Sequence, residues 1–276
     1  MLCSTPIGNL RDITLRALDE LRAADIILSE DTRRTAVLLN HHGIRSTLLS
    51  YHEHNEAERL RDVRRLLVQG SHLVAVSDAG TPSVADPGYR LLHAALEAGA
   101  EVTALPGPSA FLPALVLSGL PMHAFAFYGF LPRTFAQRDA MVREALSRPM
   151  TGVWYESPRR LPGSLSRMCA LGYGHRHAVV ARELTKLHEE VIRGTVAELA
   201  ARVSVDAPRG EIVLCIGPET GIGHPPESGM LIAVDEVMHL CAEGTALSRA
   251  VAEVAATLGM PKRALYVAAL ARRRSE

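Results

Sequence analysis

The residues best suited to a chemical role lie in one long stretch, Ser77–Gly88, which is rich in Gly, Pro, Asp and Ser. It follows an apolar segment, 72–76, that predicts a buried strand. Asp78 offers acceptor oxygens and Thr81 a donor hydroxyl, while Gly80 lets the backbone approach a ligand closely. Ligands of open α/β sheets bind beyond the carboxyl ends of strands. An ordinary strand-to-helix loop needs only about five residues, so we predict a ligand-binding loop here.

Two further Gly/Pro-rich loops, Thr5–Leu10 and Pro106–Ala110, follow other strands of the same predicted sheet. Parallel strands end at one edge of a sheet, so the three loops should converge. The sequence contains neither the GxxxxGK[ST] phosphate loop nor the GxGxxG dinucleotide fingerprint. A pocket of backbone groups with few charges suits a ligand with an adenine, a ribose and a zwitterionic tail better than a triphosphate. The alternative is three purely structural turns.

Charged residues also gather where a later strand meets a helix. Glu156 is followed by Arg159 and Arg160, and paired arginines of this kind can bind phosphates. Cations at a helix N-terminus are disfavoured by the helix dipole, so a functional role would explain why two arginines occur there. The alternative is that both are simply solvated residues at the start of the helix. A second charged turn, 182–186, contains Arg, Glu and Lys. These residues are candidates for a functional site, and the alternative is that they form a structural ion pair.

Metal chemistry receives little support from the sequence. His52 and His54 form an HxH pair with no evident third ligand, whereas zinc sites need three or four, so hydrogen-bonding histidines are favoured and no metal is expected. The four cysteines are scattered without a CxxC motif, which argues against a disulfide scaffold and fits a reducing cytoplasm. They are Cys3, Cys169, Cys215 and Cys241.

Composition describes a soluble globular chain of one large or two medium domains. The chain has 276 residues, 47% hydrophobic and 22% charged, with a formal net charge of zero. Bulk electrostatics therefore gives no support for nucleic-acid binding, and any such contact must come from local arginine clusters. Arg272–Arg274 is best interpreted as a solvated tail with some prospect of touching RNA. Neither a signal peptide nor an apolar run long enough to span a membrane is evident.

The elements that position these residues alternate between strand and helix up to residue 118. This alternation predicts a parallel sheet with helices on both faces, ending at Gly119–Pro121. A second α/β domain with a mixed sheet follows, and a Pro/Gly-rich linker separates it from a small helical region whose spacing weakly resembles a helix-turn-helix. The predicted units are residues 1–120, 121–217, 218–244 as linker and 245–276.

Seven blocks together resemble the ribosomal RNA small-subunit methyltransferase I (RsmI) family, within the tetrapyrrole methylase superfamily. The resemblance runs from the first residues through the C-terminal helices, and seven blocks in the right order are highly specific. The blocks are Thr5–Leu10, Glu30–Arg33, His52–Asn55, Ser77–Gly88, Leu105–Ala110, Tyr155–Arg160 and Ala181–Glu190.

The resemblance implies two α/β domains of the tetrapyrrole methylase type (a class III SAM methyltransferase) plus the small C-terminal helical region. S-adenosylmethionine (SAM) would lie in the cleft between the domains, in a homodimer. The reaction would methylate the ribose 2′-hydroxyl of a cytidine in the decoding region of 16S rRNA. The residues that the resemblance places at the cofactor are Pro6, Gly8, Asp78, Gly80, Thr81, Ser109, Ala110, Tyr155 and Glu211.

Such a reaction needs a proton acceptor, because a ribose hydroxyl is protonated at neutral pH and a positioned base contributes about 10²–10⁴-fold. We expect Glu30 or Asp31, at the end of the second predicted strand, because this end should face the cleft. Lys186 qualifies only if its pKa is depressed, and His54 and Glu183 are further candidates. Either Glu30→Gln or Asp31→Asn should abolish methyl transfer while SAM still binds.

The substrate implied is 16S rRNA, free or within the small ribosomal subunit. Two departures from the family stand out. The first strand, Met1–Ser4, is shorter than usual, from which we expect a start that is either truncated or misassigned. Pro162 interrupts a predicted helix. Two other functions stay open, a tetrapyrrole-precursor carbon methyltransferase and a non-catalytic RNA-binding assembly factor. The residues expected to contact RNA are Arg33, His54, Asn55, Arg159, Arg160, Arg182 and Glu183.

Overall fold

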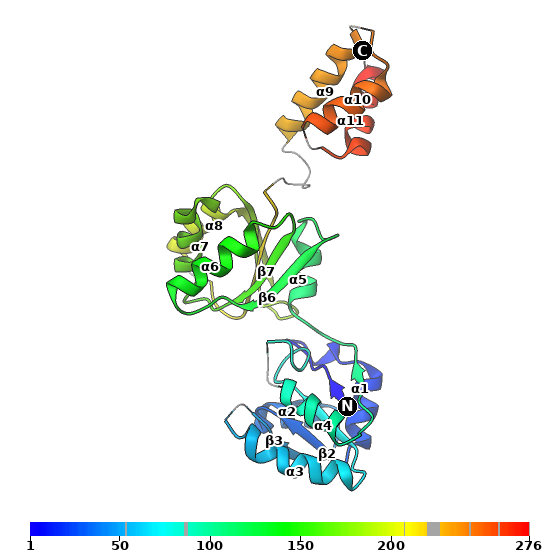
Figure 1. Ribbon diagram of the computed structural model, residues 1–276, viewed down its shortest axis with the longest axis vertical. Coiled ribbons are helices and arrows are strands. Elements are labelled where there is room, and N and C mark those ends of the chain that lie inside the picture. The colour runs from blue at the N-terminus through cyan, green and yellow to red at the C-terminus, as the bar shows by residue number, and fades with distance from the viewer. Residues whose placement is uncertain are drawn as a thin grey trace.

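The computed structural model describes residues 1–52, 54–85, 88–206, 208–219, 227–242, 244–258 and 260–275. The described chain forms two α/β lobes, each built on its own five-stranded sheet, and a separate group of three helices (Figure 1). The predicted fold class is therefore confirmed. No described helix is both long and apolar enough to cross a membrane.

The first lobe has a parallel sheet of strand order β3-β2-β4-β1-β5. The expected short first strand lies inside the sheet, where β1 pairs with β4 on one side and β5 on the other. The strands are β1 (Leu2–Cys3), β2 (Ile26–Ser29), β3 (Thr47–Ser50), β4 (Leu73–Val76) and β5 (Ala104–Leu105), and the helices are η1 (Leu10–Asp12), α1 (Leu15–Ala23), α2 (Thr32–His41), α3 (Glu56–Val68) and α4 (Tyr89–Glu97).

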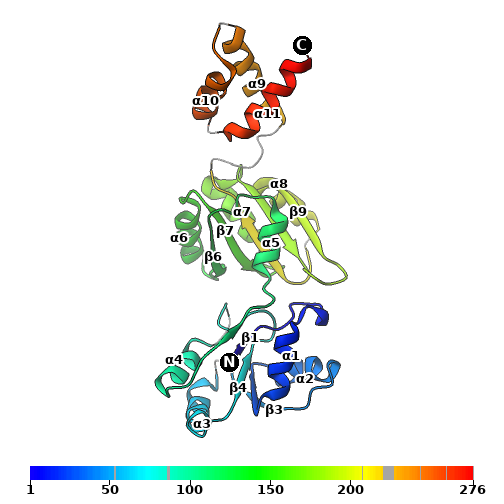
Figure 2. The ribbon, with the colours of Figure 1, turned by 90° about the vertical axis from the view of Figure 1, so that its right-hand side faces the viewer.

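Helices cover both faces of this sheet, which explains why β4 is apolar throughout. Val74 and Val76 pack with α1 and α2, whereas Leu73 and Ala75 pack with α3 and α4. The two helix pairs lie on opposite sides of the strands in Figure 2. The carboxyl ends of the strands are left free of helices, and the loops of interest begin there.

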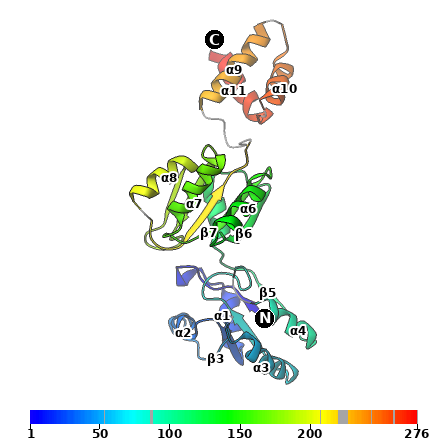
Figure 3. The same cartoon turned by 60° about the vertical axis from the view of Figure 1, so that its left-hand side comes forward.

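The second lobe has the mixed sheet that the sequence predicted, in the order β6-β7-β10-β8-β9. Among its described strands β6 and β7 pair in parallel, and the other neighbours are antiparallel. Helices α6, α7 and α8 cover one face around the buried Trp154 (Figure 3). The strands are β6 (Phe125–Phe130), β7 (Thr151–Glu156), β8 (His177–Arg182), β9 (Glu190–Thr195) and β10 (Ile212–Ile216), and the helices are α6 (Phe135–Leu146), α7 (Leu161–Met168), η2 (Cys169–Tyr173) and α8 (Val196–Val205).

Helix α5 (Phe111–Ser118) corrects the predicted boundary between the lobes. Figure 2 shows that α5 covers the other face of the second sheet. Ala114 and Leu115 pack there with Val153 and Val213. The helix is apolar on nearly all sides, so it needs a second apolar surface, and the open face of the mixed sheet provides one. The chain therefore crosses between the lobes at 106–110, before α5, and not at Gly119–Pro121.

The C-terminal group consists of three helices around a small core of its own. Val237, Val251 and Leu265 are fully buried, one from each helix. Helix α9 falls within 218–244, where composition predicted a linker, because Met230, Ala233, Val234 and Val237 pack with residues of the other two helices. The helices are α9 (Glu227–Ala242), α10 (Leu247–Thr257) and α11 (Lys262–Ser275).

Candidate functional site

The three Gly/Pro-rich loops of the first lobe converge, as expected from their positions after parallel strands. Thr5 and Gly80 exchange both backbone hydrogen bonds, at 2.8 and 2.9 Å, so the first and second loops pair directly. The Ser4 hydroxyl donates to Thr81 Oγ1 at 3.1 Å, and the Thr81 hydroxyl donates to the Pro108 carbonyl at 3.1 Å. A chain of hydroxyl groups therefore joins all three loops at the carboxyl edge of the sheet.

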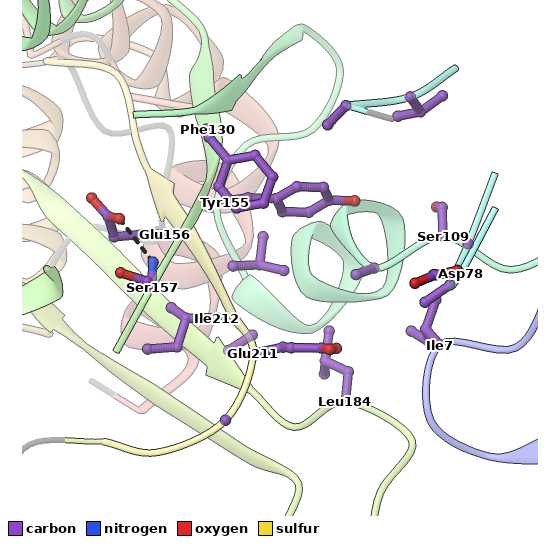
Figure 4. Close-up of a pocket in the computed structure, with 18 of the residues that line it drawn as sticks. Ile7, Asp78, Ser109, Phe130, Tyr155, Glu156, Ser157, Leu184, Glu211 and Ile212 are labelled. Carbon is purple, nitrogen blue, oxygen red and sulfur yellow. Dashed lines mark hydrogen bonds between the residues drawn. The ribbon is translucent and has the colours of Figure 1, made fainter. Parts of the chain in front are cut away.

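These loops form one wall of a cleft of about 420 Å³ between the two lobes. The opposite wall comes from the ends of β7, β8 and β10 in the second lobe, as Figure 4 shows. In the 77–88 loop, Ser83 and Ala85 have positive φ values of 69° and 63°. Backbone strain of this kind concentrates at functional sites. Polar lining residues include Glu30, Arg34, Asp78, Thr81, Ser109, Tyr155, Glu156, Ser157 and Glu211, and apolar ones Ile7, Phe130 and Leu184.

Ser109 offers the cleft a hydrogen-bonding group that no described residue uses. The residue is 8% exposed, and its buried Oγ has no hydrogen-bond partner in the described structure. A buried hydroxyl without a partner is costly, so a ligand group at this position would be stabilised. The cleft volume falls within the usual range for small-molecule sites, roughly 300–1,000 Å³. The residues present therefore fit an adenosine-containing ligand with a polar tail.

Glu30 lines the cleft from the end of β2, where the sequence placed it. Burial, followed by the nearby charge of Asp78, raises the pKa of Glu30 above the usual glutamate value, against smaller opposing effects of His52 and Arg34. Asp78 itself is held in place because its Oδ1 accepts the backbone N–H of Asp31 at 2.8 Å. Its Oδ2 lies 3.4 Å from Arg34 Nη1. Glu30 is thus the cleft carboxylate best suited to accept a proton.

Asp31 does not share this role, although sequence reasoning ranked the two carboxylates equally. Its side chain caps α2 by accepting the Arg33 backbone N–H at 2.9 Å. The Arg33 guanidinium also donates to both carboxylate oxygens, at 3.0 and 2.8 Å. These hydrogen bonds lower the pKa of Asp31 to about 2, which makes it a poor base. The Arg33 side chain is 89% exposed and engaged with Asp31, so the cleft cation is the next residue, Arg34.

Lys186 lies beside the cleft but has the wrong charge state for a base. Its Nζ donates to Glu183 at 2.8 Å and to Glu211 at 3.3 Å. Burial alone would lower the pKa of Lys186, but these two carboxylates outweigh it and raise the pKa above the ordinary value. The depressed pKa that a catalytic role would require is therefore absent, because the lysine has two acidic partners, 3 and 25 residues away in sequence. Lys186 is an ammonium group at neutral pH.

Glu183 serves this turn as an internal support. Its Oε1 accepts the Lys186 ammonium and also the backbone N–H of Glu211 at 3.0 Å. Gly210 packs against the same carboxylate with a φ of 86°, and a Cβ at this position would lie 2.2 Å from Glu183 Oε1. The hydrogen bond with Lys186 lowers the pKa of Glu183. The predicted role of Glu183 in contacting RNA is replaced by that of holding the 183–186 turn against the cleft wall.

A second hollow of about 340 Å³ adjoins the cleft and accounts for two more predicted residues. Pro6 and Gly8 line it together with Lys186, while Asp78 and Glu211 line both cavities. The Lys186 side chain passes directly over Gly8, where a Cβ would lie 2.4 Å from its Cγ. Glycine is therefore required there for close approach of the two loops.

Arg160 is directed inward and not toward a phosphate. Its guanidinium donates to the Pro132 carbonyl at 2.9 Å and to that of Leu131, and its Nε lies 3.2 Å from Glu156. The Glu156 carboxylate is fully buried and also accepts the Ser164 hydroxyl at 2.7 Å. Arg160 thus compensates a buried charge, and its predicted contact with RNA is corrected.

The other residues predicted to contact RNA fall into two groups, those with internal partners and those exposed to solvent. Arg182 donates to Glu190 at 2.7 Å and is an internal ion pair, which was the alternative interpretation of its turn. Asn55 holds its own turn by accepting the His52 N–H at 2.8 Å and donating to Ser50. His54 is exposed, with its ring 6.0 Å from that of His52, and does not line the cleft. Arg159 is exposed and forms no ion pair with any described residue.

Sequence reasoning missed Arg34 and Phe130, both of which line the cleft. Arg34 neighbours a predicted residue, and only the register of α2 decides which arginine faces inward. Phe130 ends β6 and contacts Tyr155 edge to face, with ring centroids 5.4 Å apart (Figure 4). No group of three His, Cys, Asp or Glu side chains that could hold a metal ion occurs among the described residues.

Comparison with known proteins agrees with this architecture. Residues 1–200 match the family described as Tetrapyrrole (Corrin/Porphyrin) Methylases, and residues 231–273 match the RsmI C-terminal HTH domain. The methyltransferase CobJ shares the fold, with a TM-score of 0.60 and 20% identity over 77% of this chain and 91% of that one. So does uroporphyrin-III C-methyl transferase from Thermus thermophilus complexed with S-adenyl homocysteine, with a TM-score of 0.55 and 19% identity over 78% and 95%. The fold and cleft thus define a tetrapyrrole methylase-type protein.

Curated relatives narrow this class. A protein of Mesorhizobium japonicum is 45% identical over 266 residues, 96% of this chain and 89% of the relative. One of Halalkalibacterium halodurans is 41% identical over 267 residues, 96% and 92%. Both are named ribosomal RNA small subunit methyltransferase I. The chain belongs to the ribosomal RNA small subunit methyltransferase I family.

Proposed function

We propose that this protein transfers a methyl group from SAM to the ribose 2′-hydroxyl of a cytidine in 16S rRNA. The observation that carries the proposal is the cleft between the lobes, in which a buried, unpartnered hydroxyl and a carboxylate of raised pKa line the same space. The names of the relatives supply the substrate, and the S-adenyl homocysteine bound to the Thermus thermophilus neighbour supplies the class of cofactor.

SAM would supply an electrophilic methyl group on a sulfonium sulfur. The polar tail would lie against the 78–81 loop, with Ser109 donating or accepting the hydrogen bond that its Oγ now lacks. Tyr155 and Ile212, at the ends of β7 and β10, would receive the adenine. An aromatic and an aliphatic side chain suit a neutral base better than a phosphate.

Glu30 would accept the proton of the ribose hydroxyl. Its raised pKa makes it a stronger base than an ordinary glutamate. Arg34 and Lys186, one from each lobe, both line the hollow that adjoins the cleft, where they would attract the phosphates that flank the target ribose. Proton acceptance and phosphate attraction would thus come from different side chains.

The decisive experiment maps 2′-O-methylation on 16S rRNA from cells with and without the gene. We expect one cytidine to lose its 2′-O-methyl group when the gene is absent and to regain it with purified protein, SAM and small subunits. Methyl incorporation into a tetrapyrrole precursor instead would support a carbon methyltransferase. Binding to subunits without incorporation of labelled methyl would support a non-catalytic assembly factor.

We further propose that the protein works as a cytoplasmic homodimer, as the family resemblance implies. Exposed apolar side chains on α5 and β6, including Leu112, Val116 and Phe125, offer a surface that a second copy would cover. Sedimentation equilibrium of the full chain gives the mass directly, and a monomer at micromolar concentration would contradict the proposal.

A further inference from the structure

A short surface loop, 130–135, is anchored by side-chain hydrogen bonds beside the mouth of the cleft. Two guanidinium groups donate to its carbonyls. Arg138, which is only 6% exposed, donates to the carbonyl of Pro132 at 3.1 Å and to that of Arg133 at 3.2 Å. Arg160 donates to the carbonyls of Leu131 and Pro132. Three consecutive carbonyls are thus fixed by two largely buried cations.

The loop presents large apolar and cationic side chains to solvent. Phe130 is 56% exposed and Phe135 is 68% exposed, at opposite ends of the loop. Arg133 lies between them and Arg159 follows the neighbouring strand, and both are exposed without an ion-pair partner among the described residues. These exposed phenylalanine rings do not stabilise the fold, because apolar side chains lower the free energy of folding only when they are removed from water.

The position of the loop links it to the reaction. Phe130 itself lines the cleft, and Leu131 N–H donates to the Tyr155 carbonyl at 3.3 Å. The Phe135 ring is in turn supported by the Arg138 guanidinium, 5.5 Å from its centroid. A single strand of nucleic acid that passed Phe130 at the cleft would therefore next meet Arg133 and Phe135 of the same loop.

We propose that residues 130–135 form a platform for single-stranded RNA next to the target nucleotide. Bases would stack on Phe130 and Phe135, and phosphates would pair with Arg133 and Arg159. Aromatic stacking combined with backbone-tracking cations is the general chemistry by which proteins bind single strands. The inference rests on the proposed function and adds a binding surface outside the cofactor cleft.

Charge favours RNA over a second protein copy at this platform. Neither arginine forms an ion pair with a described carboxylate: Asp139 is engaged by Arg167, Glu156 is buried, and the exposed Glu211 lies 3.3 Å from Lys186. The apolar face of α5, in contrast, lacks cations among its exposed residues. We therefore assign the platform to RNA and leave the α5 face to self-association.

The test uses the full-length protein with unmethylated small subunits and labelled SAM. Phe135→Ala should raise the KM for subunits roughly tenfold, since removal of one stacking aromatic weakens single-strand binding by about 5- to 150-fold. The Kd for SAM and kcat should stay unchanged, because Phe135 lies outside the cleft. Arg133→Gln should weaken binding of a short single-stranded RNA and lower the salt slope by about 0.7.

Matched controls are Tyr89→Ala, an aromatic residue 72% exposed in the first lobe, and Arg143→Gln, an exposed arginine on α6. Neither control should change the KM for subunits or the salt slope. The proposal is overturned if Phe135→Ala and Arg133→Gln behave like these controls while the wild type methylates subunits. It is also overturned if either variant lowers the mass of the protein in sedimentation, which would assign the surface to a protein partner. A wild type that transfers no methyl group refutes the proposed function instead.

Discussion

Gly210 offers a sharp test of how the cleft wall is held. Its φ of 86° is unfavourable for any residue with a side chain, and a new Cβ would lie 2.2 Å from Glu183 Oε1 and 2.5 Å from its Cγ. In Gly210→Ala the Glu183 side chain must therefore move away. It would lose its hydrogen bonds with Lys186 and with the Glu211 N–H.

The expected cost is the sum of two terms. The left-handed backbone costs an alanine about 1–2 kcal/mol. Hydrogen bonds to charged groups contribute about 1.5–3 kcal/mol each, but partial exposure of Lys186 and Glu183 reduces this to roughly 1.5 kcal/mol for both. Gly210→Ala should thus destabilise the second lobe by about 3 kcal/mol. Because Gly210 and Glu211 line the cleft, the Kd for SAM should rise about tenfold, or 1.4 kcal/mol.

The matched control is Gly172→Ala, also in the second lobe. Gly172 has a φ of 94°, and a Cβ added there would meet nothing within 4 Å, so only the backbone term applies. Urea unfolding followed by fluorescence isolates this lobe, because Trp154 is the single tryptophan of the chain and is fully buried there. Calorimetry gives the Kd for SAM.

Acid provides an internal check on the same pair of variants. The hydrogen bond with Lys186 keeps the pKa of Glu183 below its usual value. This interaction therefore stabilises the fold at neutral pH, and its contribution is lost as the pH falls through the lowered pKa. The difference between Gly210→Ala and Gly172→Ala should narrow in acid. Equal unfolding free energies and equal SAM affinities for the two variants at neutral pH would refute the reasoning.

Four further outcomes are expected. Glu30→Gln should lower kcat by about 10²–10⁴-fold with an unchanged Kd for SAM in calorimetry, whereas Asp31→Asn should keep most of the activity; the reverse order would exclude Glu30 as the base. The wild-type kcat should fall with decreasing pH at a higher pH than an ordinary glutamate would give, and the residual activity of Glu30→Gln should lack this step. Arg160→Met should destabilise the second lobe by about 3 kcal/mol in urea, because Glu156 is left buried without its cation, and a change below about 1 kcal/mol would contradict this assignment. Ser109→Ala should weaken SAM binding severalfold in calorimetry without lowering stability, since its hydroxyl has no partner to lose.

The sequence predicted those parts of the site that depend on strand order alone. The three loops around Thr5, Gly80 and Pro108 had to meet, because parallel strands of one sheet end at the same edge. The same reasoning pointed to the two carboxylates after a buried strand, Glu30 and Asp31, without choosing between them. Local pattern and topology were sufficient for these predictions, and no distant side chain was needed.

The charged residues could not be assigned in this way, because their roles depend on partners far along the chain. Arg160 finds carbonyls 28 and 29 residues away, and Lys186 finds Glu211 25 residues away. The same limit applies to α5. Its apolar sequence predicts burial but does not determine which of the two sheets the helix packs against. Composition likewise placed a linker over α9, since the prolines and glycines just before it obscured its start.

The crossing segment at 106–110 has a consequence for how the protein responds to its ligands. It is the covalent hinge between the two α/β lobes, and Ser109 and Ala110 within it also line the cleft. Any rotation of one lobe against the other would therefore move residues that line the cleft. Ligand binding in the cleft and a change of the angle between the lobes should consequently be coupled.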